Sequence, residues 1–267
     1  MLISSGSWRL INTGECSAAY NMALDEAIAV SVRNGMAPPT LRLYAWDSPS
    51  VSLGHFQKNR DVNIEYCLDS GIPIVRRPTG GRAILHDREL TYSFSVKTDN
   101  ELFSKGIFDS YKKISSALQL ALLKIGISPE VRTDKKTLNA ARRTPLCFQA
   151  TSYGEITVNN RKVIGSAQKH WADGLLQQGS IPYHIDKSEI QKVFVLQTDQ
   201  DITEVMAGLN DMLPDLKDED FRDIIKDSFE ETFDISFTLA FPTPEEESLA
   251  LVLENEKYQK SDWTIRQ

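Results

Sequence analysis

The sequence predicts an α+β fold in which a mixed β-sheet is flanked by helices. Three observations carry this prediction: an apolar-periodic stretch near the start is typical of one long helix, short segments with strand character follow it, and the part beyond Pro182 is mostly helical in character. We expect a single domain over residues 1–267, with a core at 1–182 and an acidic helical segment at 183–267 packed on it.

The first half of the chain is expected to begin with a helix and to continue with strands. Ser17 suits the N-cap of a helix over Ala18–Asn34, which Gly35 and the prolines after it end. Segments with strand character follow at Leu41–Trp46, Val51–Leu53, Ile72–Arg76 and Leu90–Lys97. In the last of these, Thr and Ser alternate with Tyr, Phe and Val, which is typical of a half-buried strand.

The second half is expected to contain a helix, two hairpins and an acidic helical end. The sequence predicts a helix over Ile107–Ile125 and a loop or short helix over Asp134–Arg143. The simplest interpretation of the next stretch is two successive hairpins, with strands at Glu155–Val158, Lys162–Lys169 and Leu175–Ile181 and turns at Asn159–Asn160 and Asp173–Gly174. Helices are predicted over Glu219–Thr232 and after the Thr243 cap, with Pro244 in the first turn.

Charge and hydropathy exclude several classes of protein. The formal net charge of −7 disfavours general nucleic-acid binding, which depends on cations that neutralise phosphates. The charge is uneven, at +6 over residues 1–182 and −13 over residues 183–267. This pattern fits a working surface that receives an anionic partner, and equally a solvated acidic helical face. We find no apolar run long enough for a membrane span and no signal peptide, so we expect a cytoplasmic protein.

Cysteine and histidine usage gives no sign of a disulfide framework or of a metal site. Three scattered cysteines, Cys16, Cys67 and Cys147, leave at least one free thiol. The four histidines form no close pair with metal-ligand spacing. We therefore predict no metal.

The densest unusual stretch is Arg76–Arg82, in which two adjacent glycines stand between arginines. Glycines let the backbone approach a ligand closely, and guanidinium groups offer planar donors to carbonyl, carboxylate or phosphate oxygens. A glycine turn between strands with solvated arginines explains the same residues about as well. The stretch alone does not decide between the two.

Four motifs in order along the chain resemble the biotin/lipoate protein ligase superfamily. They are Asn21–Glu26, Leu53–Gln57, the arginine–glycine stretch Arg76–Arg82, and Lys162–Gln168, which has the pattern Lys-Val-x-Gly-Ser-Ala. The resemblance implies a ligase-like catalytic domain that binds a fatty-acyl group beside the arginine–glycine stretch. It also implies delivery of that acyl group to one lysine of a small carrier domain.

The resemblance also implies a set of substrate-binding residues. These are Arg76, Arg77, Thr79, Gly80, Gly81, His86, Gly165, Ser166 and Ala167. Backbone N–H groups near Gly80–Gly81 or near Gly165–Ala167 could hold the oxyanion of the reaction, and both alternatives stay open. For His86, a core histidine satisfied by the backbone is nearly as good an interpretation as a pocket residue.

Cys147 separates two branches of this superfamily. The segment Cys147–Tyr153 resembles the active-cysteine segment of the LipM-type octanoyltransferases, and Lys162 follows at the same offset of 15 residues. The implied activity transfers octanoyl from octanoyl-acyl carrier protein to a lysine of a lipoyl-domain protein, such as glycine cleavage H protein, in lipoate biosynthesis. It proceeds through a thioester on the cysteine and needs no cofactor.

The chemistry of a cysteine–lysine pair fits this activity. Thioester exchange needs a thiolate, and a nearby cation favours that form of the thiol. We therefore take Cys147 and Lys162 as the candidate catalytic pair, with Lys162 exchanging protons with the leaving thiol and the incoming amine. Taken alone, Cys147 would be an inert buried thiol and Lys162 an exposed hairpin lysine.

Two other functions and one surface prediction follow from the same residues. The first rival is an ATP- and magnesium-dependent lipoate or octanoate ligase, and the second is a non-catalytic module that binds acylated carriers. Under the transferase interpretation we expect a positive approach surface for the acidic carrier protein. It would be formed by Arg76, Arg77, Arg82, Arg142 and Arg143.

Overall fold

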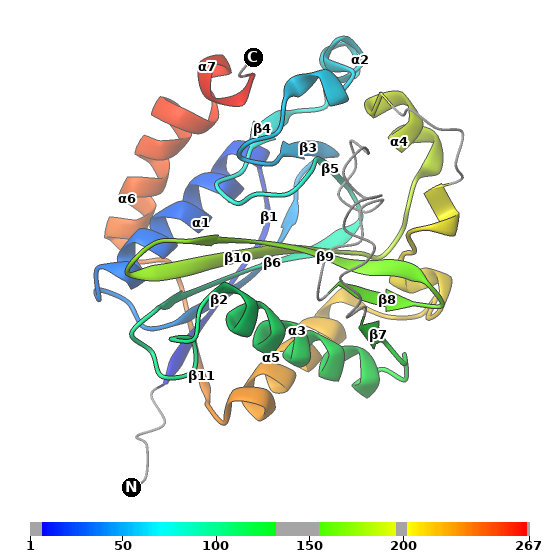
Figure 1. Ribbon diagram of the computed structural model, residues 1–267. Coiled ribbons are helices and arrows are strands. Elements are labelled where there is room, and N and C mark those ends of the chain that lie inside the picture. Colours follow the sequence, from blue (N-terminus) through cyan, green and yellow to red (C-terminus); the bar gives the residue numbers. More distant parts are fainter. Residues whose placement is uncertain (1–6, 132–154, 196–201, 266–267) are drawn as a thin grey trace, which may run out of the picture.

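The computed structural model describes residues 7–131, 155–195 and 202–265, and its main feature is an eight-stranded mixed sheet (Figure 1). The strand order is β11-β1-β2-β6-β10-β9-β8-β7. β1 is parallel to both of its neighbours, and the other neighbouring strands are antiparallel. The strands span Trp8–Cys16 (β1), Thr40–Trp46 (β2), Glu89–Lys97 (β6), Glu130–Val131 (β7), Ile156–Val158 (β8), Arg161–His170 (β9), Gly174–Pro182 (β10) and Phe237–Ala240 (β11).

A second, three-stranded sheet lies beside the first, so the expectation of one sheet was wrong. It has the order β4-β3-β5, with strands Ser50–Leu53 (β3), Ile74–Arg76 (β4) and Ile84–His86 (β5). Pro49 and the polar residues before it interrupt the strand pattern after β2, and β3 then pairs with β4 and β5 instead of with the large sheet.

Helices cover both faces of the large sheet (Figure 1). α1 (Ala18–Arg33) and α6 (Pro244–Leu253) pack together on one face, and α3 (Ile107–Lys124) and α5 (Asp218–Phe233) pack together on the other. The shorter helices are α2 (Ile64–Asp69), α4 (Lys187–Val193) and α7 (Ser261–Thr264), with single turns at Asn59–Asp61, Ile202–Glu204, Leu209–Asp211 and Glu254–Tyr258. Among the described residues, no helix is long and apolar enough to cross a membrane.

The cap and turn signals of the sequence are confirmed. The Ser17 side chain accepts a hydrogen bond from the N–H of Tyr20 at 3.2 Å, and Thr243 forms a capping box with Glu246. Asn159 and Asn160 both have positive φ, at 50° and 62°, as a tight hairpin turn requires. The stretch 134–143 lies outside the described residues.

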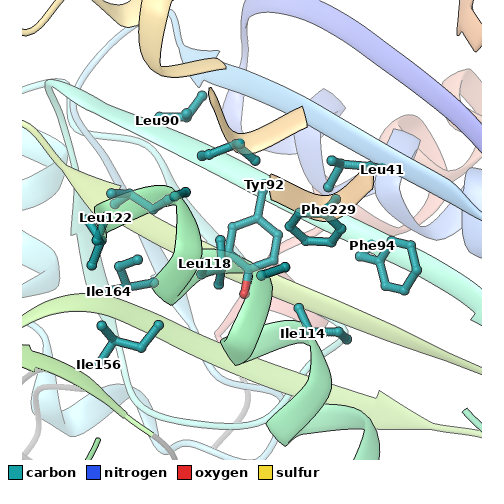
Figure 2. Close-up of a cluster of buried hydrophobic side chains, with 14 of the residues drawn as sticks. Leu41, Leu90, Tyr92, Phe94, Ile114, Leu118, Leu122, Ile156, Ile164 and Phe229 are labelled. Atoms are coloured by element: carbon teal, nitrogen blue, oxygen red, sulfur yellow. The ribbon is translucent and has the colours of Figure 1, made fainter. Parts of the chain in front are cut away.

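The α3 face of the sheet carries a large apolar core (Figure 2). Tyr92 and Phe94 of β6 are fully buried against Leu118 of α3 and Phe229 of α5. The other face of β6 is buried as well, because Thr91 and the serines on that side lie under α1. The prediction of a half-buried strand was therefore wrong for β6.

The acidic C-terminal segment contributes a strand to the large sheet and a helix to the layer that covers its α3 face. β11 adds an edge strand through parallel pairing with β1, and α5 completes the α3 face. Phe221, Ile225 and Phe229 of α5 are fully buried in the apolar core. The described part of this segment therefore packs on the same sheet as the residues before it, and one domain over residues 1–267 stays a prediction.

Candidate functional site

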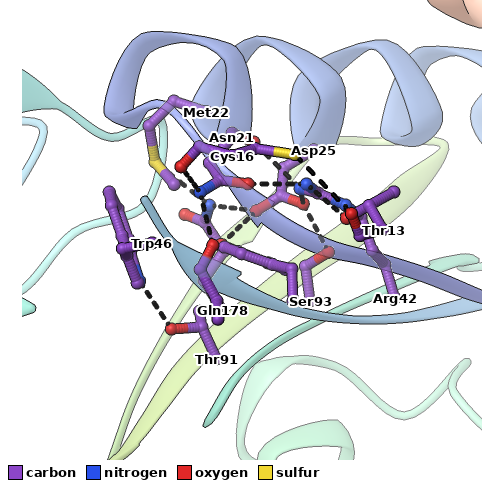
Figure 3. A network of polar contacts seen from close by, with 12 residues as sticks. Thr13, Cys16, Asn21, Met22, Asp25, Arg42, Trp46, Thr91, Ser93 and Gln178 are labelled. Atoms are coloured by element: carbon purple, nitrogen blue, oxygen red, sulfur yellow. Dashed lines mark hydrogen bonds and ion pairs between the residues drawn. The ribbon is translucent and has the colours of Figure 1, made fainter. Parts of the chain in front are cut away.

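A buried carboxylate lies at the centre of the α1 face of the sheet (Figure 3). Oδ1 of Asp25 accepts hydrogen bonds from Arg42 at 2.7 Å and Ser93 at 2.6 Å. Oδ2 accepts hydrogen bonds from Tyr44 at 2.9 Å and Gln178 at 2.7 Å. Burial, followed by the Asp25 charge, raises the pKa of Tyr44 well above its usual value, so its hydroxyl keeps the proton that it donates.

Arg42 supplies the counter-charge for this carboxylate and is itself completely buried. Its Nη2 donates to Oδ1 of Asn21 at 2.6 Å, and its Nε and Nη2 both donate to Thr13 Oγ1. Asn21 and Asp25 are four residues apart on α1, so both side chains face the sheet. The motif Asn21–Glu26 thus places a paired, hydrogen-bonded charge under the site.

Gln178 connects this buried network to the arginine–glycine stretch. Its Nε2 donates to Asp25 at 2.7 Å, and its Oε1 accepts from the Thr79 hydroxyl at 2.8 Å. Thr79 is fully buried, and its carbonyl accepts a hydrogen bond from His55 N–H at 2.9 Å. The position of the loop at residues 77–82 therefore depends on a charge held by α1.

A close backbone contact fixes the other side of this loop. A Cβ atom at Gly54 would lie 1.9 Å from the carbonyl oxygen of Gly81, which is too close for any side chain. Arg77 fastens the loop from inside: its Nη2 donates to the carbonyls of Gly80 and Arg82 at 2.8 and 2.7 Å. Its Nη1 donates to Ser52.

Arg76, which the sequence led us to expect as a substrate-binding residue, hydrogen-bonds to backbone carbonyls inside the protein. Its guanidinium donates to the carbonyls of Gly54 and Gln57 at 2.7 and 2.6 Å, and to those of Trp263 and Thr264 at 3.1 and 2.9 Å. The side chain joins the loop to α7 and does not line the pocket described below.

The predicted positive approach surface was wrong for two of its five arginines. Arg76 and Arg77 are only 1% and 4% exposed, because their guanidinium groups satisfy backbone carbonyls inside the protein. Arg82 is partly exposed, and Arg142 and Arg143 lie outside the described residues.

A narrow pocket lies between α1, the small sheet and the hairpin of β9 and β10. Its cavity volume is about 20 Å³, close to that of one water molecule, so an acyl chain would have to displace side chains to enter. Of the predicted substrate-binding residues, it is lined by Arg77, His86, Gly165, Ser166 and Ala167. The other lining residues are Met22, Tyr44, Trp46, Ser52, Ile84, Thr91, Gln178, Gly179 and Ser180.

His86 is a buried pocket residue with a partner at each ring nitrogen. Its Nε2 lies 2.7 Å from Ser52 Oγ, and its Nδ1 lies 2.7 Å from Glu89 Oε1. The ring stacks on Trp46 with centroids 3.9 Å apart. Glu89 also accepts from Trp46 Nε1 at 3.2 Å and from Ser180 Oγ at 2.6 Å, so one carboxylate fixes both rings of the pocket wall.

Lys162 is buried, which excludes its interpretation as an exposed hairpin lysine. Only 2% of its side chain is exposed, and its Nζ lies 2.6 Å from Oε1 of Glu155, whose side chain is 4% exposed. β9 carries Lys162 on the same strand as the pocket residues Gly165–Ala167. Cys147 lies outside the described residues.

Sequence reasoning missed three residues that organise the site: Glu155, Gln178 and Glu89. All three are buried polar residues; Glu89 and Gln178 lie on strands, and Glu155 directly precedes β8. A glutamate close to a lysine across a two-residue turn, and a glutamine pair within an apolar strand, are weak signals that could have found the first two. Among the described residues, no group of three His, Cys, Asp or Glu side chains could hold a metal ion.

Curated relatives match nearly the whole chain. Residues 17–230 match the family model of the lipoyl protein ligase A/B catalytic domain. The octanoyltransferase LipM of Carboxydothermus hydrogenoformans is 36% identical over 269 residues, which cover 97% of this chain and 99% of that protein. The octanoyltransferase LipM of Moorella thermoacetica is 40% identical over 194 residues, which cover 72% of this chain and 71% of that protein.

Solved structures share the fold over the same length. A lipoate protein ligase from T. acidophilum with bound lipoic acid has a TM-score of 0.81 and 25% identity, over 97% of this chain and 100% of its own. A lipoate-protein ligase A bound with ATP has a TM-score of 0.82 and 25% identity, over 97% and 99% of the two chains. The chain therefore belongs to the lipoyl protein ligase A/B catalytic-domain family and is similar over its whole length to the octanoyltransferase LipM group.

Proposed function

We propose that this protein is an octanoyltransferase of lipoate biosynthesis. It takes octanoyl from octanoyl-acyl carrier protein and transfers it to a lysine of a lipoyl-domain protein, such as glycine cleavage H protein. The observation that carries the proposal is the similarity to octanoyltransferases over 97% of the chain, together with a cysteine at position 147 and a buried lysine at position 162.

The proposed mechanism assigns a step to each part of the site. The Cys147 thiolate attacks the donor thioester, and Lys162 exchanges protons with the leaving thiol and then with the incoming lysine amine. The acyl chain would enter the pocket between α1 and β9–β10, where Met22 and Trp46 supply apolar walls. Backbone N–H groups of the Gly80–Gly81 loop or of Gly165–Ala167 would hold the oxyanion.

The pocket wall suggests how the acyl chain could be accommodated. The rings of Tyr44, Trp46 and His86 are each held by hydrogen bonds. In the described part of the chain, Met22 has one weak hydrogen bond, in which Gln178 donates to its sulfur at 3.4 Å, and otherwise makes apolar contacts. A methionine has three rotatable bonds and adapts readily to an irregular space. Met22 is therefore the wall that we expect to move when the chain enters.

An ATP-dependent lipoate or octanoate ligase is the second candidate. The similarity of this chain to a lipoate-protein ligase A solved with ATP, at 25% identity, favours it. In that case free acid and ATP would form an acyl-adenylate, and Cys147 would have no role. A module that only binds acylated carriers is a third candidate, which would bind octanoyl-acyl carrier protein reversibly without turnover.

Intact-protein mass spectrometry tests the proposal directly. The enzyme is mixed with octanoyl-acyl carrier protein without ATP, and we expect a mass increase of one octanoyl group that hydroxylamine removes and that maps to Cys147. Cys67 is an internal control, since burial raises the pKa of its thiol to about 11 and keeps it from competing. A Cys147→Ala protein should form no adduct. Transfer that appears only with ATP and free acid would overturn the proposal in favour of the ligase.

A further inference from the structure

The ion pair between Lys162 and Glu155 is nearly completely buried. The two charged groups are 2.6 Å apart, and their side chains are 2% and 4% exposed. Removing one member of a buried pair leaves an uncompensated charge, so such groups act as a unit. Lys162 therefore reaches any reacting atom with Glu155 beside it.

The backbone around this pair is held on both sides. The N–H of Lys162 donates to the carbonyl of Val205 at 2.8 Å, and its carbonyl accepts from Ala207 N–H at 3.0 Å. The hairpin turn at Asn159–Asn160 connects β8, which begins directly after Glu155, to β9, which carries Lys162, and the register of this pair shifts between Ile156 and Thr157. A fixed main chain leaves the position of the amine to be decided by the end of the side chain, where the Glu155 carboxylate binds it.

The other acidic residues described around this hairpin are exposed or pair elsewhere. In the described residues 155–170 and 202–211, Arg161 pairs with Asp211 at 3.7 Å, and their side chains are 29% and 41% exposed. Glu204 is exposed. Glu155 also lies between the two candidate catalytic residues in the chain, eight residues after Cys147 and seven before Lys162.

We infer that Glu155 is the positioning residue of Lys162, whose amine it holds at one point through their buried ion pair. This inference rests on the proposed function and adds to it the group that fixes the proton donor. A reacting group that is misplaced by about 1 Å can lose about 100-fold in rate, so a carboxylate that fixes the amine has a large effect on the chemical step.

The proton balance of the reaction needs an ammonium at its start. The thiolate of Cys147 forms a bond to the acyl carbon, the bond to the donor sulfur breaks, and Lys162 gives its proton to that sulfur. The neutral amine of the acceptor lysine then attacks the thioester, which releases the Cys147 thiolate, and its surplus proton returns to Lys162. The net products are the free donor thiol and the amide.

The test measures single-turnover acyl-enzyme formation by quenched mass spectrometry in five full-length proteins. These are the wild type, Glu155→Gln, Glu155→Asp, Lys162→Ala and the double variant Glu155→Gln with Lys162→Ala. We expect Glu155→Gln to lower the rate at saturating donor by about 10- to 100-fold with little change in the donor concentration at half-maximal rate. Glu155→Asp should recover part of the loss, and Glu155→Gln should cost nothing further in the Lys162→Ala background.

A matched control and the contrary outcomes separate positioning from mere support of the fold. Asp211→Asn removes the carboxylate that pairs with Arg161 of the same hairpin. This change should leave the rate of acyl-enzyme formation unchanged. The inference would be overturned if Glu155→Gln reacted at the wild-type rate. It would also be overturned if Glu155→Gln lowered the rate by the same factor in the Lys162→Ala background as in the wild type. If the wild type forms no acyl-enzyme, the proposed function fails; the same variants, measured with ATP and octanoate, then decide the role of Glu155 by the same criteria.

Discussion

The two faces of β6 are built on opposite principles. On the α3 face, Tyr92, Phe94 and Val96 pack into an apolar core that includes α3 and α5 (Figure 2). On the α1 face, Ser93 and Gln178 both bind the buried Asp25 carboxylate (Figure 3). Thr91 binds the Glu89 carboxylate, and Gln178 also binds Thr79 of the loop at residues 77–82. One strand therefore contributes stability through one face and positions the site through the other.

This difference has a physical cause. Apolar burial is non-directional and tolerates small rearrangements, whereas a buried polar network is stable only when every member finds its partners. On the α1 face, the hydrogen bonds of this network are directional, and they fix the position of the loop at residues 77–82. Substitutions on the two faces should therefore change stability and rate in different proportions.

The largest effect is expected from Asp25→Ala on the α1 face. This change leaves the Arg42 guanidinium buried without its counter-charge and removes an acceptor from three further donors. We expect the free energy of unfolding in urea to fall by about 3–5 kcal/mol, with a slower acyl transfer by the folded enzyme. Asp25→Asn keeps the shape and tests the charge alone. A loss below about 1 kcal/mol, the value of an ordinary hydrogen bond, would contradict the assignment.

A second prediction concerns Leu118→Ala on the α3 face, a residue of α3 that is 1% exposed. The lost contacts and the resulting cavity should lower the free energy of unfolding by about 2–5 kcal/mol. Acyl transfer per folded molecule should not change, because this side chain belongs to the core on the far side of the sheet from Asp25. Urea denaturation and single-turnover rates measure the two quantities. A marked fall in the rate would show that the two faces are coupled.

The smallest change in stability is expected from Thr79→Val, which removes the hydroxyl that donates to Gln178. One lost hydrogen bond should lower the free energy of unfolding by about 0.5–1.5 kcal/mol. The rate should nevertheless fall clearly, because the loop loses its connection to the Asp25 network. Thr79→Ser retains the hydroxyl and should keep most of the activity. Equal rates for the two variants would show that this hydrogen bond does not position the loop for acyl transfer.

Much of the fold could be predicted from local sequence signals. The helices α1, α3, α5 and α6 and the hairpin of β8 and β9 follow from caps, periodicity and turn residues, which act within a few positions of the chain. β1, β5, β7 and β11 were missed. β5 has three residues and β11 four, and β1 finds one of its partners more than 220 residues away, so short-range patterns carry little information about them.

Residues of the site could be predicted only where they belong to a sequence motif. His86 and Gly165–Ala167, which the resemblance named, line the pocket, and their role in substrate binding stays a prediction. Arg76 instead donates to backbone carbonyls. Which arginine points inward depends on the twist and pairing of β4, which no spacing rule encodes. The partnership of Lys162 with Glu155 depends on a register shift between β8 and β9, and this also cannot be obtained from spacing.

The bonds of Arg76 have a consequence for the timing of synthesis. Its guanidinium donates to carbonyls of residues 54–57 and to those of Trp263 and Thr264. The last two residues lie 187 and 188 positions after Arg76 in the chain. Nascent chains emerge at about 5–20 residues per second, so the first acceptors leave the ribosome many seconds before the last. The loop beside the pocket therefore reaches its final hydrogen bonding only after translation has passed residue 264.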